Sequence, residues 1–371
     1  LLNTLGVRGA GLMDIILEKV QVPSSNILGK IGGGIELIQT ALDRDYLNLA
    51  ASLTGLLRYL LSYANEQCLQ RHQFGRPIGD YGLVQAMLAD MALNLYAMES
   101  GVSYFAGLLD AQPARDLGLE ASCLKVFCSE ALWTAVNACV QLSGRAGLEQ
   151  TNPFNRYLRD CRSLLSYAGT NEVLRLRLAG SGLQHIAHDV DEKHNKLYVM
   201  NRHPWLTLKT VMEMRARKRG RYANHVGAGP KVTEGGASRA LKNHLHPNFA
   251  KVSTDLAILV QRFQSLSEAL LIAHGQSVIN EQMALGRVAN CATDLLLSAI
   301  CLGRASRAIS IGLLLHDYEV RLAATFVKLA CKRVEANMVA LDVLDSERHR
   351  IASEMLSHRR YPVVHPITRV W

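Results

Sequence analysis

The sequence is poor in residues that interrupt helices and in the patterns that build metal sites. It has only 9 prolines, and aromatic residues make up 6% of its 371 positions. Its 8 cysteines form no Cys-x-x-Cys pair, so neither a zinc site nor a disulfide framework is indicated. We therefore expect no metal and interpret the cysteines as small buried hydrophobic residues in a reducing compartment.

Long uncharged apolar runs are absent as well. No stretch of about eighteen residues lacks a charge, which a membrane-spanning helix would need. The nearest candidate, 296–315, contains Arg304 and Arg307, and we predict that it forms a pair of buried core helices. The net charge of +9 is moderate, and only Arg215 to Arg221 forms a basic run, so nucleic-acid binding is not expected.

The residues that are present favour helices. Apolar residues make up 49% and charged residues 20% of the chain, which is ordinary for a soluble globular protein. From Asp80, a predicted N-cap, apolar residues recur with i, i+3, i+4, i+7 spacing as far as Phe105. Similar periodicity predicts helices over about 35–67, 118–143, 171–186, 280–299 and 318–344, with a polar irregular segment at 143–170.

The chain divides into four regions by pattern. Residues 1–33 alternate apolar and polar side chains before a glycine cluster, which predicts the last strands of a β-domain. Residues 34–186 and 249–371 are predicted to form two helical bundles joined by a basic linker at 187–248. Because the chain begins in what reads as the middle of a structured segment, we interpret it as part of a longer protein or a truncated relative.

Several short motifs occur in the order and spacing of one enzyme family. They are Leu5-Gly6-Val7-Arg8-Gly9, Arg71-His72-Gln73-Phe74-Gly75, Gln141-Leu142-Ser143-Gly144, Arg159-Asp160-Cys161-Arg162 and Ala168-Gly169-Thr170-Asn171-Glu172. Together they resemble the acyl-CoA dehydrogenase family, and 249–371 resembles the extra helical domain of its very-long-chain enzymes and of family member nine. The resemblance implies a mainly α fold. It consists of the carboxyl-terminal four-helix bundle (34–186) and a second helical domain, preceded by the end of a middle β-domain.

The residue at the base position departs from the family pattern. In the family reaction, a glutamate removes the proton alpha to a thioester while a hydride leaves the beta carbon for flavin. The resemblance places that glutamate at Ala168, whose methyl group accepts no proton. Loss of a positioned base costs on the order of 10²–10⁴ in rate, so we expect no dehydrogenase activity.

A substitute base is implied by relatives that carry the carboxylate on the first helix of this domain. That position falls on Asp45, which is one methylene shorter than glutamate, and the arginine that follows it in those relatives is Tyr46. The alternative is that Asp45 is one of several surface charges.

The resemblance also implies residues that contact FAD, in part the FAD of a neighbouring subunit, although retention of the cofactor stays open. They are Arg71, Gln73, Phe74, Gln141, Gly144, Thr170 and Glu172. Arginine suits a pyrophosphate because it is a fixed cation with several donors. Arg145 replaces a second family glycine, and its side chain either blocks close approach or contacts a phosphate.

Structural roles are the alternatives for these residues. Arg71 would form an ion pair at the end of a helix, and Phe74 would be an aromatic residue of the core. Gln141 and Gly144 would mark a helix end. Thr170 and Glu172 would form a capping pair.

Three functions follow from the resemblance. The first is a catalytically degenerate structural or assembly subunit associated with mitochondrial respiratory complex I, on the matrix side of the inner membrane. The second is an active FAD-dependent long- or very-long-chain acyl-CoA dehydrogenase that uses Asp45 as base. The third is the non-catalytic half of a heterodimer with an active paralogue, a homodimer being the other pairing implied.

The sequence of the basic linker allows two interpretations. A short helix at 205–214 followed by the basic run would suit contact with anionic lipid, so residues 200–221 are a candidate for contact with the inner membrane. The alternative is a solvated basic loop.

Overall fold

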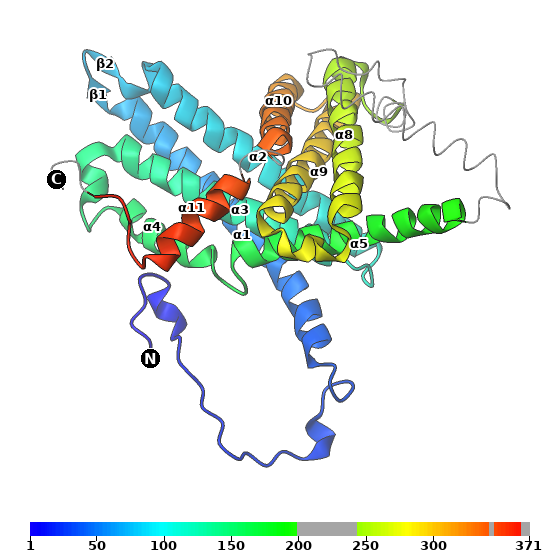
Figure 1. Cartoon of the computed structure of the whole chain (residues 1–371). Coiled ribbons are helices and arrows are strands. Elements are labelled where there is room, and N and C mark those ends of the chain that lie inside the picture. Colours follow the sequence, from blue (N-terminus) through cyan, green and yellow to red (C-terminus); the bar gives the residue numbers. More distant parts are fainter. Residues whose placement is uncertain (199–242, 341–344, 365–371) are drawn as a thin grey trace.

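The protein is built from long helices, as the sequence predicts. A computed structural model describes residues 1–198, 243–340 and 345–364 (Figure 1). The helices are α1 (Gly34–Gln70), α2 (Gly82–Ala111), α3 (Gly118–Ser143), α4 (Pro153–Leu164), α5 (Asn171–Tyr198), α8 (Ala250–His274), α9 (Gln282–Ser310), α10 (His316–Ala340) and α11 (Asp345–Ser357). In the described part of the chain, the strands are β1 (His72–Gln73) and β2 (Arg76–Pro77), an antiparallel hairpin between α1 and α2. The mainly α prediction is confirmed.

Helix α3 is the centre of the first helical domain. It packs against α1, α2, α4 and α5, and buried side chains occur around most of its circumference. Leu124, Leu132 and Val136 are fully buried, and Cys139 is buried beside them. A helix that is apolar on every side stays stable in water only when other helices surround it, and here α1, α2 and α5 do so. These four helices form the predicted bundle.

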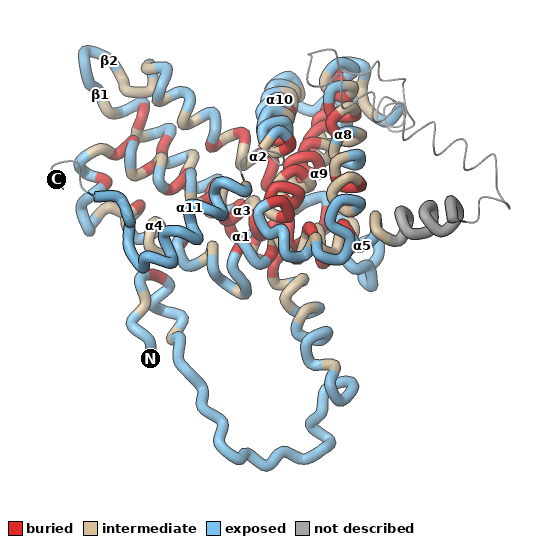
Figure 2. The backbone as a smooth tube through the Cα atoms, viewed as in Figure 1, coloured by how far each residue is buried: buried red, intermediate tan, exposed pale blue. Residues whose placement is uncertain are grey.

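The second set of helices shares one core with the first. Helix α9 lies against α2 and α5, and α10 against α2 (Figures 1 and 2). Gly101 on α2 permits this approach, because a Cβ there would lie 2.7 Å from Leu124 Cδ2 and 3.0 Å from Leu297 Cδ2. Phe127 and Phe326 meet edge to face across the junction, 6.1 Å apart. Among the described helices, the two predicted helical bundles therefore pack against each other through a shared core.

A polar cluster fastens the same junction. The Arg304 guanidinium of α9 lies over the Tyr96 ring of α2, 4.5 Å from its centroid. It also pairs with Glu99 at 3.5 Å and with Glu319 of α10 at 3.4 Å. The Tyr96 hydroxyl donates to Glu319 at 3.1 Å. One arginine thus joins three helices.

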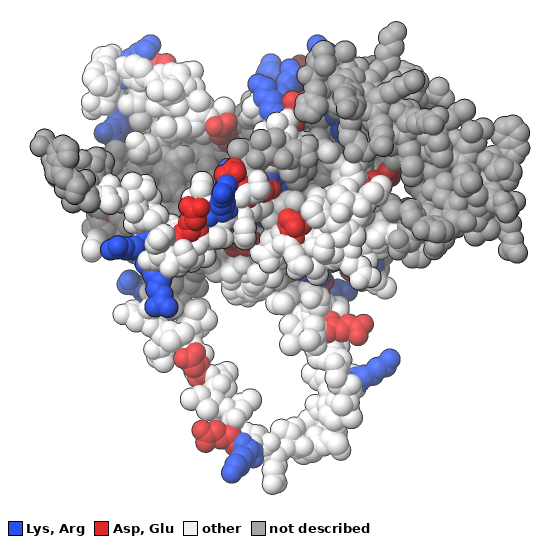
Figure 3. All heavy atoms as spheres, viewed as in Figure 1, with Lys and Arg blue, Asp and Glu red and all other residues white. Residues whose placement is uncertain are grey.

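The amino-terminal prediction needs correction. Residues 1–33 contain no strand, only short 3-10 turns at Arg8–Ala10 and Ser24–Asn26, and most of them form an exposed arch (Figure 1). Ile15, Ile16 and Leu17 are each more than three-quarters exposed. A strand needs a ladder of backbone hydrogen bonds to a neighbour, and in this segment a single contact, Leu2 N–H to Leu12 O at 2.8 Å, does not build one. The arch is largely uncharged on the face that Figure 3 shows.

Other boundaries also differ from the sequence prediction. The segment 143–170, predicted irregular, contains α4, whose N-cap Asn152 accepts a hydrogen bond from the Phe154 N–H. Asp80 is not the cap of α2, since that position is Tyr81. Helix α5 continues to Tyr198, so the first part of the predicted linker is helical. The predicted helix at 205–214 and the basic run lie outside the described residues.

Some of the described helices are as long and as apolar as membrane-spanning helices. Three helical segments of the described chain (118–148, 247–280 and 282–310) are long and apolar enough to cross a membrane by length and composition alone, which corrects the expectation that no segment qualifies. The first and third have 61% of their most apolar window buried inside the protein. The predicted helix pair at 296–315 is instead the end of α9 and an exposed turn after Ser310.

Candidate functional site

The turn between α4 and α5 carries Ala168, the residue at the predicted base position. Ala168 has φ 51° and Gly169 has φ 111°, so two consecutive residues adopt left-handed backbone conformations. Tyr46 of α1 is buried beneath the turn, and its hydroxyl donates to the Ala168 carbonyl oxygen at 2.6 Å. Ala121 and Leu174 complete the apolar layer around this contact. The side chain of Ala168 is a methyl group, which can neither accept nor donate a proton.

A buried lysine fixes the shape of this turn. Lys125 of α3 is fully buried, and its ammonium donates to Leu165 O at 3.4 Å, Gly169 O at 3.0 Å and Asn171 Oδ1 at 2.8 Å. Burial lowers the pKa of Lys125 from 10.5 to about 8. Lys125 is not among the residues predicted from the sequence. Its signal is a single cation in the helix-periodic stretch 118–143, because a buried cation needs hydrogen-bond acceptors such as carbonyl oxygens.

Asn171 links the lysine to a second polar group. Its amide donates to Ser129 Oγ at 3.0 Å and to Glu130 Oε1 at 3.1 Å. Glu130 accepts from Arg175 of α5, with an ion-pair distance of 2.6 Å. Every polar atom of the Asn171 side chain therefore has a partner, and the start of α5 is held rigidly against α3.

Thr170 and Glu172 occupy the beginning of α5. Thr170 Oγ1 accepts from the Val173 N–H at 3.4 Å, which is a capping contact. A backbone hydrogen bond at the helix start, a hydrogen bond to Thr170 and nearby positive charge lower the pKa of Glu172. The structure thus shows the capping role that the sequence left open. Contact of either residue with a flavin stays a prediction.

Asp45 lies beside the same turn. It is half-buried, and the charge of Asp45 and a hydrogen bond to it raise the pKa of Tyr167, the residue before Ala168. The predicted substitute base and the predicted base position are therefore neighbours in space, although more than a hundred residues separate them in sequence. The role of Asp45 as a base stays a prediction.

The predicted flavin residues near α1 and α3 form a second group. Arg71 ends α1, and its Nη1 donates to the Ser143 carbonyl at the end of α3, 2.6 Å away. Gly144 follows with φ 58°, and a Cβ there would lie 3.0 Å from Arg71 Nη2. Glycine suits this position because it adopts a positive φ readily and has no Cβ to clash with Arg71. No carboxylate among the described residues pairs with Arg71, so the predicted helix-terminal ion pair is absent there.

The hairpin beside Arg71 presents an aromatic side chain to solvent. Phe74 and Gly75 have φ 53° and 85°, the backbone of a tight hairpin turn. The Phe74 side chain is 94% exposed, so the core-aromatic interpretation is wrong. The Tyr81 hydroxyl supports the turn by donating to Gln73 O at 2.8 Å. Gln141, also predicted, is exposed nearby on α3.

The two groups lie near opposite ends of α3. Lys125 holds the Ala168 turn, and Ser143 holds Arg71. Eighteen residues of helix separate these two positions, which is about 27 Å at 1.5 Å per residue. The seven residues predicted to contact the cofactor therefore lie in two separate groups and do not line one pocket of this chain. Among the described residues, no group of His, Cys, Asp and Glu is arranged to hold a metal ion.

Comparisons with known families agree with this architecture. Residues 32–183 match the family described as acyl-CoA dehydrogenase, C-terminal domain, and residues 247–361 match the one described as ACAD9/ACADV, C-terminal domain. The chain contains an acyl-CoA dehydrogenase C-terminal domain followed by a C-terminal domain of the ACAD9/ACADV type. The resemblance inferred from the sequence motifs is thereby confirmed at the level of the family.

Individual relatives give the extent of the similarity. The mitochondrial very long-chain specific acyl-CoA dehydrogenases of Mus musculus and Homo sapiens are each 30% identical over 338 residues, which is 91% of this chain and 49% of each relative. An acyl-CoA dehydrogenase of Bacillus subtilis (strain 168) is 35% identical over 172 residues, 46% of this chain and 45% of that protein. The chain thus spans about half the length of the curated relatives it matches.

A solved structure shows the same fold over nearly the whole chain. The acyl-CoA dehydrogenase from Bacillus anthracis, complexed with FAD, aligns with a TM-score of 0.63 at 22% identity. The alignment covers 94% of this chain and 57% of that one. Both helical sets, including α8 to α10, therefore follow a fold known from experiment.

Proposed function

We propose that this chain is a catalytically degenerate member of the family that serves as a structural or assembly subunit. The observation that carries the proposal is the Ala168 turn. Tyr46, Lys125 and Asn171 hold its backbone in a fixed conformation, yet the side chain at the base position is a methyl group. The scaffold is kept, and the group that would accept the alpha proton is replaced.

The proposed loss of chemistry is tested with an acyl-CoA thioester. The purified chain, with any flavin that it retains, is mixed anaerobically with palmitoyl-CoA, and the flavin absorbance is followed. We expect no bleaching. Rapid bleaching by the unmodified chain would contradict the proposal.

FAD binding is a further part of the proposal. The Arg71 guanidinium has donors that Ser143 does not occupy, and Gly144 lets a backbone approach it closely, so this corner fits a phosphate. Arg145 is exposed and does not fill the corner. Arg71, Gln73 and Phe74 would then hold the pyrophosphate and adenosine side of a neighbouring subunit's FAD. FAD, when bound, supplies a hydride acceptor.

The proposed setting is the matrix side of the mitochondrial inner membrane, with respiratory complex I or its assembly factors as partner. The support is the similarity to mitochondrial relatives and to the ACAD9/ACADV domain. Mass-spectrometric profiling of native gels tests it. Co-migration with complex I or its intermediates is expected, and migration solely as a free dimer would contradict it.

A second candidate function is an active dehydrogenase that uses Asp45 as base. The specific observation in its favour is that Asp45 lies against Tyr167, one residue from the base position. Under this alternative the chain would bleach flavin, and Asp45→Asn would abolish the bleaching.

A third candidate is a heterodimer in which this chain completes the flavin site of a competent paralogue. The exposed hairpin and the half-buried Arg71 favour it, since both face away from the core. In such a heterodimer, Arg71→Ala would lower the turnover of the active paralogue. The isolated chain would be inactive with or without the substitution.

A further inference from the structure

The turn between α9 and α10 holds large apolar side chains in solvent. They belong to Ile311, Leu313, Leu314, Leu315 and Tyr318. Leu314 is 91% exposed. Helices α9 and α10 pack along each other, so the turn is the end of a helical hairpin (Figure 1). An exposed apolar cluster of this kind is typical of a surface that contacts another molecule or a membrane.

The backbone of the turn is partly satisfied by its own hydrogen bonds. The Gly312 N–H donates to Ile309 O at 3.1 Å, and the Leu313 N–H donates to Ala308 O at 3.0 Å. The His316 N–H donates to Leu313 O at 3.1 Å. Because unpaired backbone groups are costly away from water, these bonds lower the cost of moving the turn out of water.

Leu315 adopts a conformation that leucine rarely takes. Its φ is 67°, in the left-handed region that favours glycine and asparagine. Its side chain is 69% exposed, so burial in the described core does not compensate for the strain. The sequence thus has a large apolar side chain at a position where a small polar one would be less strained.

Three cations lie at the helix ends around the turn. Arg307 in the last turn of α9 and Arg321 in the second turn of α10 are exposed, and no described carboxylate pairs with either. Lys251 is exposed in the first turn of α8. The His246 N–H donates to Ser306 Oγ at 2.7 Å, which places the start of α8 beside the end of α9.

Acids are fewer at the same helix ends. Asp317 is exposed, 3.5 Å from the His316 ring, and Glu319 already pairs with Arg304 at 3.4 Å. Asp255 lies one turn further along α8 than the lysine. Three cations therefore face one unengaged carboxylate on the described ends of α8, α9 and α10. Figure 3 shows basic side chains over the upper part of α10. This excess favours an anionic surface.

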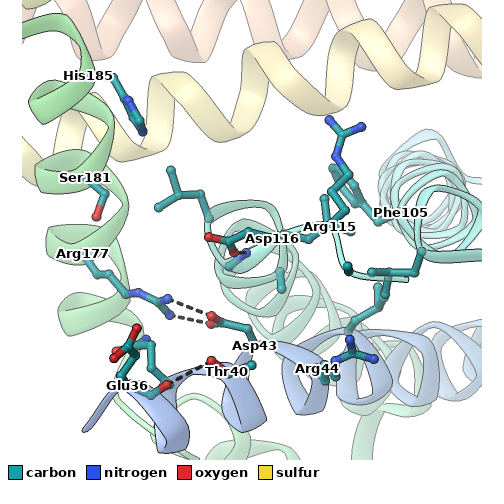
Figure 4. A pocket seen from close by; sticks show the side chains of 18 of the residues that line it. Glu36, Thr40, Asp43, Arg44, Phe105, Arg115, Asp116, Arg177, Ser181 and His185 are labelled. Atoms are coloured by element: carbon teal, nitrogen blue, oxygen red, sulfur yellow. Dashed lines mark hydrogen bonds and ion pairs between the residues drawn. The ribbon is translucent and has the colours of Figure 1, made fainter. Parts of the chain in front are cut away.

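The cavity at the start of α1 has balanced charge by contrast. It measures about 840 Å³, and Asp43 pairs with Arg177 at its edge, 2.7 Å apart (Figure 4). Its lining contains equal numbers of acids and arginines, namely Glu36, Asp43, Asp116, Arg44, Arg115 and Arg177. The cavity therefore has no excess of positive charge from its arginines, whereas the α9–α10 turn does.

We propose that the α9–α10 turn inserts Leu314 and Leu315 into the headgroup region of an anionic lipid bilayer. The three cations contact lipid phosphates, and Tyr318 lies at the boundary between headgroups and acyl chains. Its ring already lies beneath the Arg321 guanidinium, 5.9 Å from the ring centroid. Tyrosine and arginine suit such a boundary because each has an apolar body and a polar tip.

A bilayer fits this surface better than a second copy of the chain. A bilayer is an extended anionic surface, so cations on three helix ends contribute without converging on one point. Pairing two copies through their turns would instead bring two sets of cations together. The residues of the turn belong neither to the Ala168 turn nor to the Arg71 corner. Lipid contact is therefore independent of whether the chain is catalytically degenerate.

Vesicle sedimentation of the full chain tests the proposal, with vesicles of phosphatidylcholine and phosphatidylglycerol in equal parts as the probe. We expect the chain to bind these vesicles and to bind pure phosphatidylcholine vesicles more weakly. The double variant Leu314→Ser, Leu315→Asn should bind about tenfold or more weakly, because it removes two exposed apolar side chains. Asparagine tolerates a positive φ, so the turn should keep its conformation.

Two further variants separate the contributions. The matched control is Ile272→Ser, Ile279→Ser, which changes side chains that are 67% and 69% exposed near the other end of α9 and should leave the affinity unchanged. Arg307→Gln, Arg321→Gln should remove most of the preference for anionic vesicles and leave binding to phosphatidylcholine unchanged, since each cation near an anionic membrane contributes about fivefold.

Three results would overturn the proposal. One is equal vesicle binding by the parent and the leucine double variant at equal thermal unfolding midpoints, which would place lipid contact elsewhere in the chain. Another is absence of vesicle binding by the parent. The third is a lipid-free dimer in sedimentation velocity that the leucine double variant dissociates, which would show that a second copy covers the turn.

Discussion

At the scale of single residues, Lys125 determines the geometry of the turn that carries Ala168. Its ammonium is the shared donor for two backbone carbonyls and the Asn171 side chain. An apolar side chain of similar length would leave these acceptors buried without a partner. Each such loss costs about 1–3 kcal/mol, so Lys125 is a larger contributor to stability than an exposed lysine.

We expect Lys125→Met to lower the free energy of unfolding by about 3 kcal/mol at neutral pH. Urea denaturation measures the change. The matched control is Lys328→Met, an exposed lysine on α10, which should change stability by less than about 0.5 kcal/mol. Equal effects of the two substitutions would show that the buried contacts do not hold the turn.

The pH dependence of the same pair of proteins gives a second prediction. The pKa of Lys125 is lowered to about 8 in the folded chain, against 10.5 for an ordinary lysine. Between these two values the unfolded chain holds more protons, so the contribution of Lys125 to stability rises as pH increases through this window. The stability of the parent relative to Lys125→Met should therefore increase from pH 8 to 10. A constant difference would contradict the buried-cation assignment.

Residue roles were only partly predictable from the sequence. The motif positions of Arg71 and Gly144 led to a pair that the structure brings into contact. Phe74 was left between a core and a cofactor role, and the positive φ that turns it outward depends on the hairpin and is not visible in residue type. Lys125 was missed because a lone lysine carries no information about which carbonyls surround it.

At the scale of elements, Arg304 joins α2, α9 and α10. We expect Arg304→Ala to destabilise the protein by about 2 kcal/mol, because it leaves the half-buried Glu319 without a cationic partner and uncovers the Tyr96 ring. Glu99 would keep its ion pair with Arg58. Arg307→Ala, one turn further along the same helix and exposed, should cost less than about 0.5 kcal/mol. Urea denaturation compares them, and similar losses would mean that the cluster does not fasten the helices.

Long periodic helices were predicted well, and short or partner-dependent elements were not. The i, i+3, i+4 pattern places α1, α3 and α10 within a few residues of their observed limits, whereas α9 continues eleven residues beyond its predicted end. Helix α4 was missed because its sequence is polar, although Asn152-Pro153 is an ordinary helix start. The alternation in 1–33 predicts strands, but alternation gives a strand only where a neighbouring strand completes the hydrogen bonds.

At the scale of the whole molecule, the helices of both family domains form one core. Gly101, Leu124 and Leu297 meet where α2, α3 and α9 converge. We therefore expect scanning calorimetry to show a single cooperative unfolding transition for the described helices. Two well-separated transitions would indicate that the junction is only a weak contact between independent domains. The shared core of the two helical domains was not predicted, because the local pattern of residues carries no information about contacts between distant segments.

We propose that the chain does not remove the alpha proton of a thioester. Exchange of the C2 hydrogens of palmitoyl-CoA in deuterated buffer, followed by NMR with FAD added, tests this step directly. We expect exchange at the buffer rate for the parent chain and a faster rate for Ala168→Glu. Accelerated exchange by the parent chain that disappears in Asp45→Asn would contradict it.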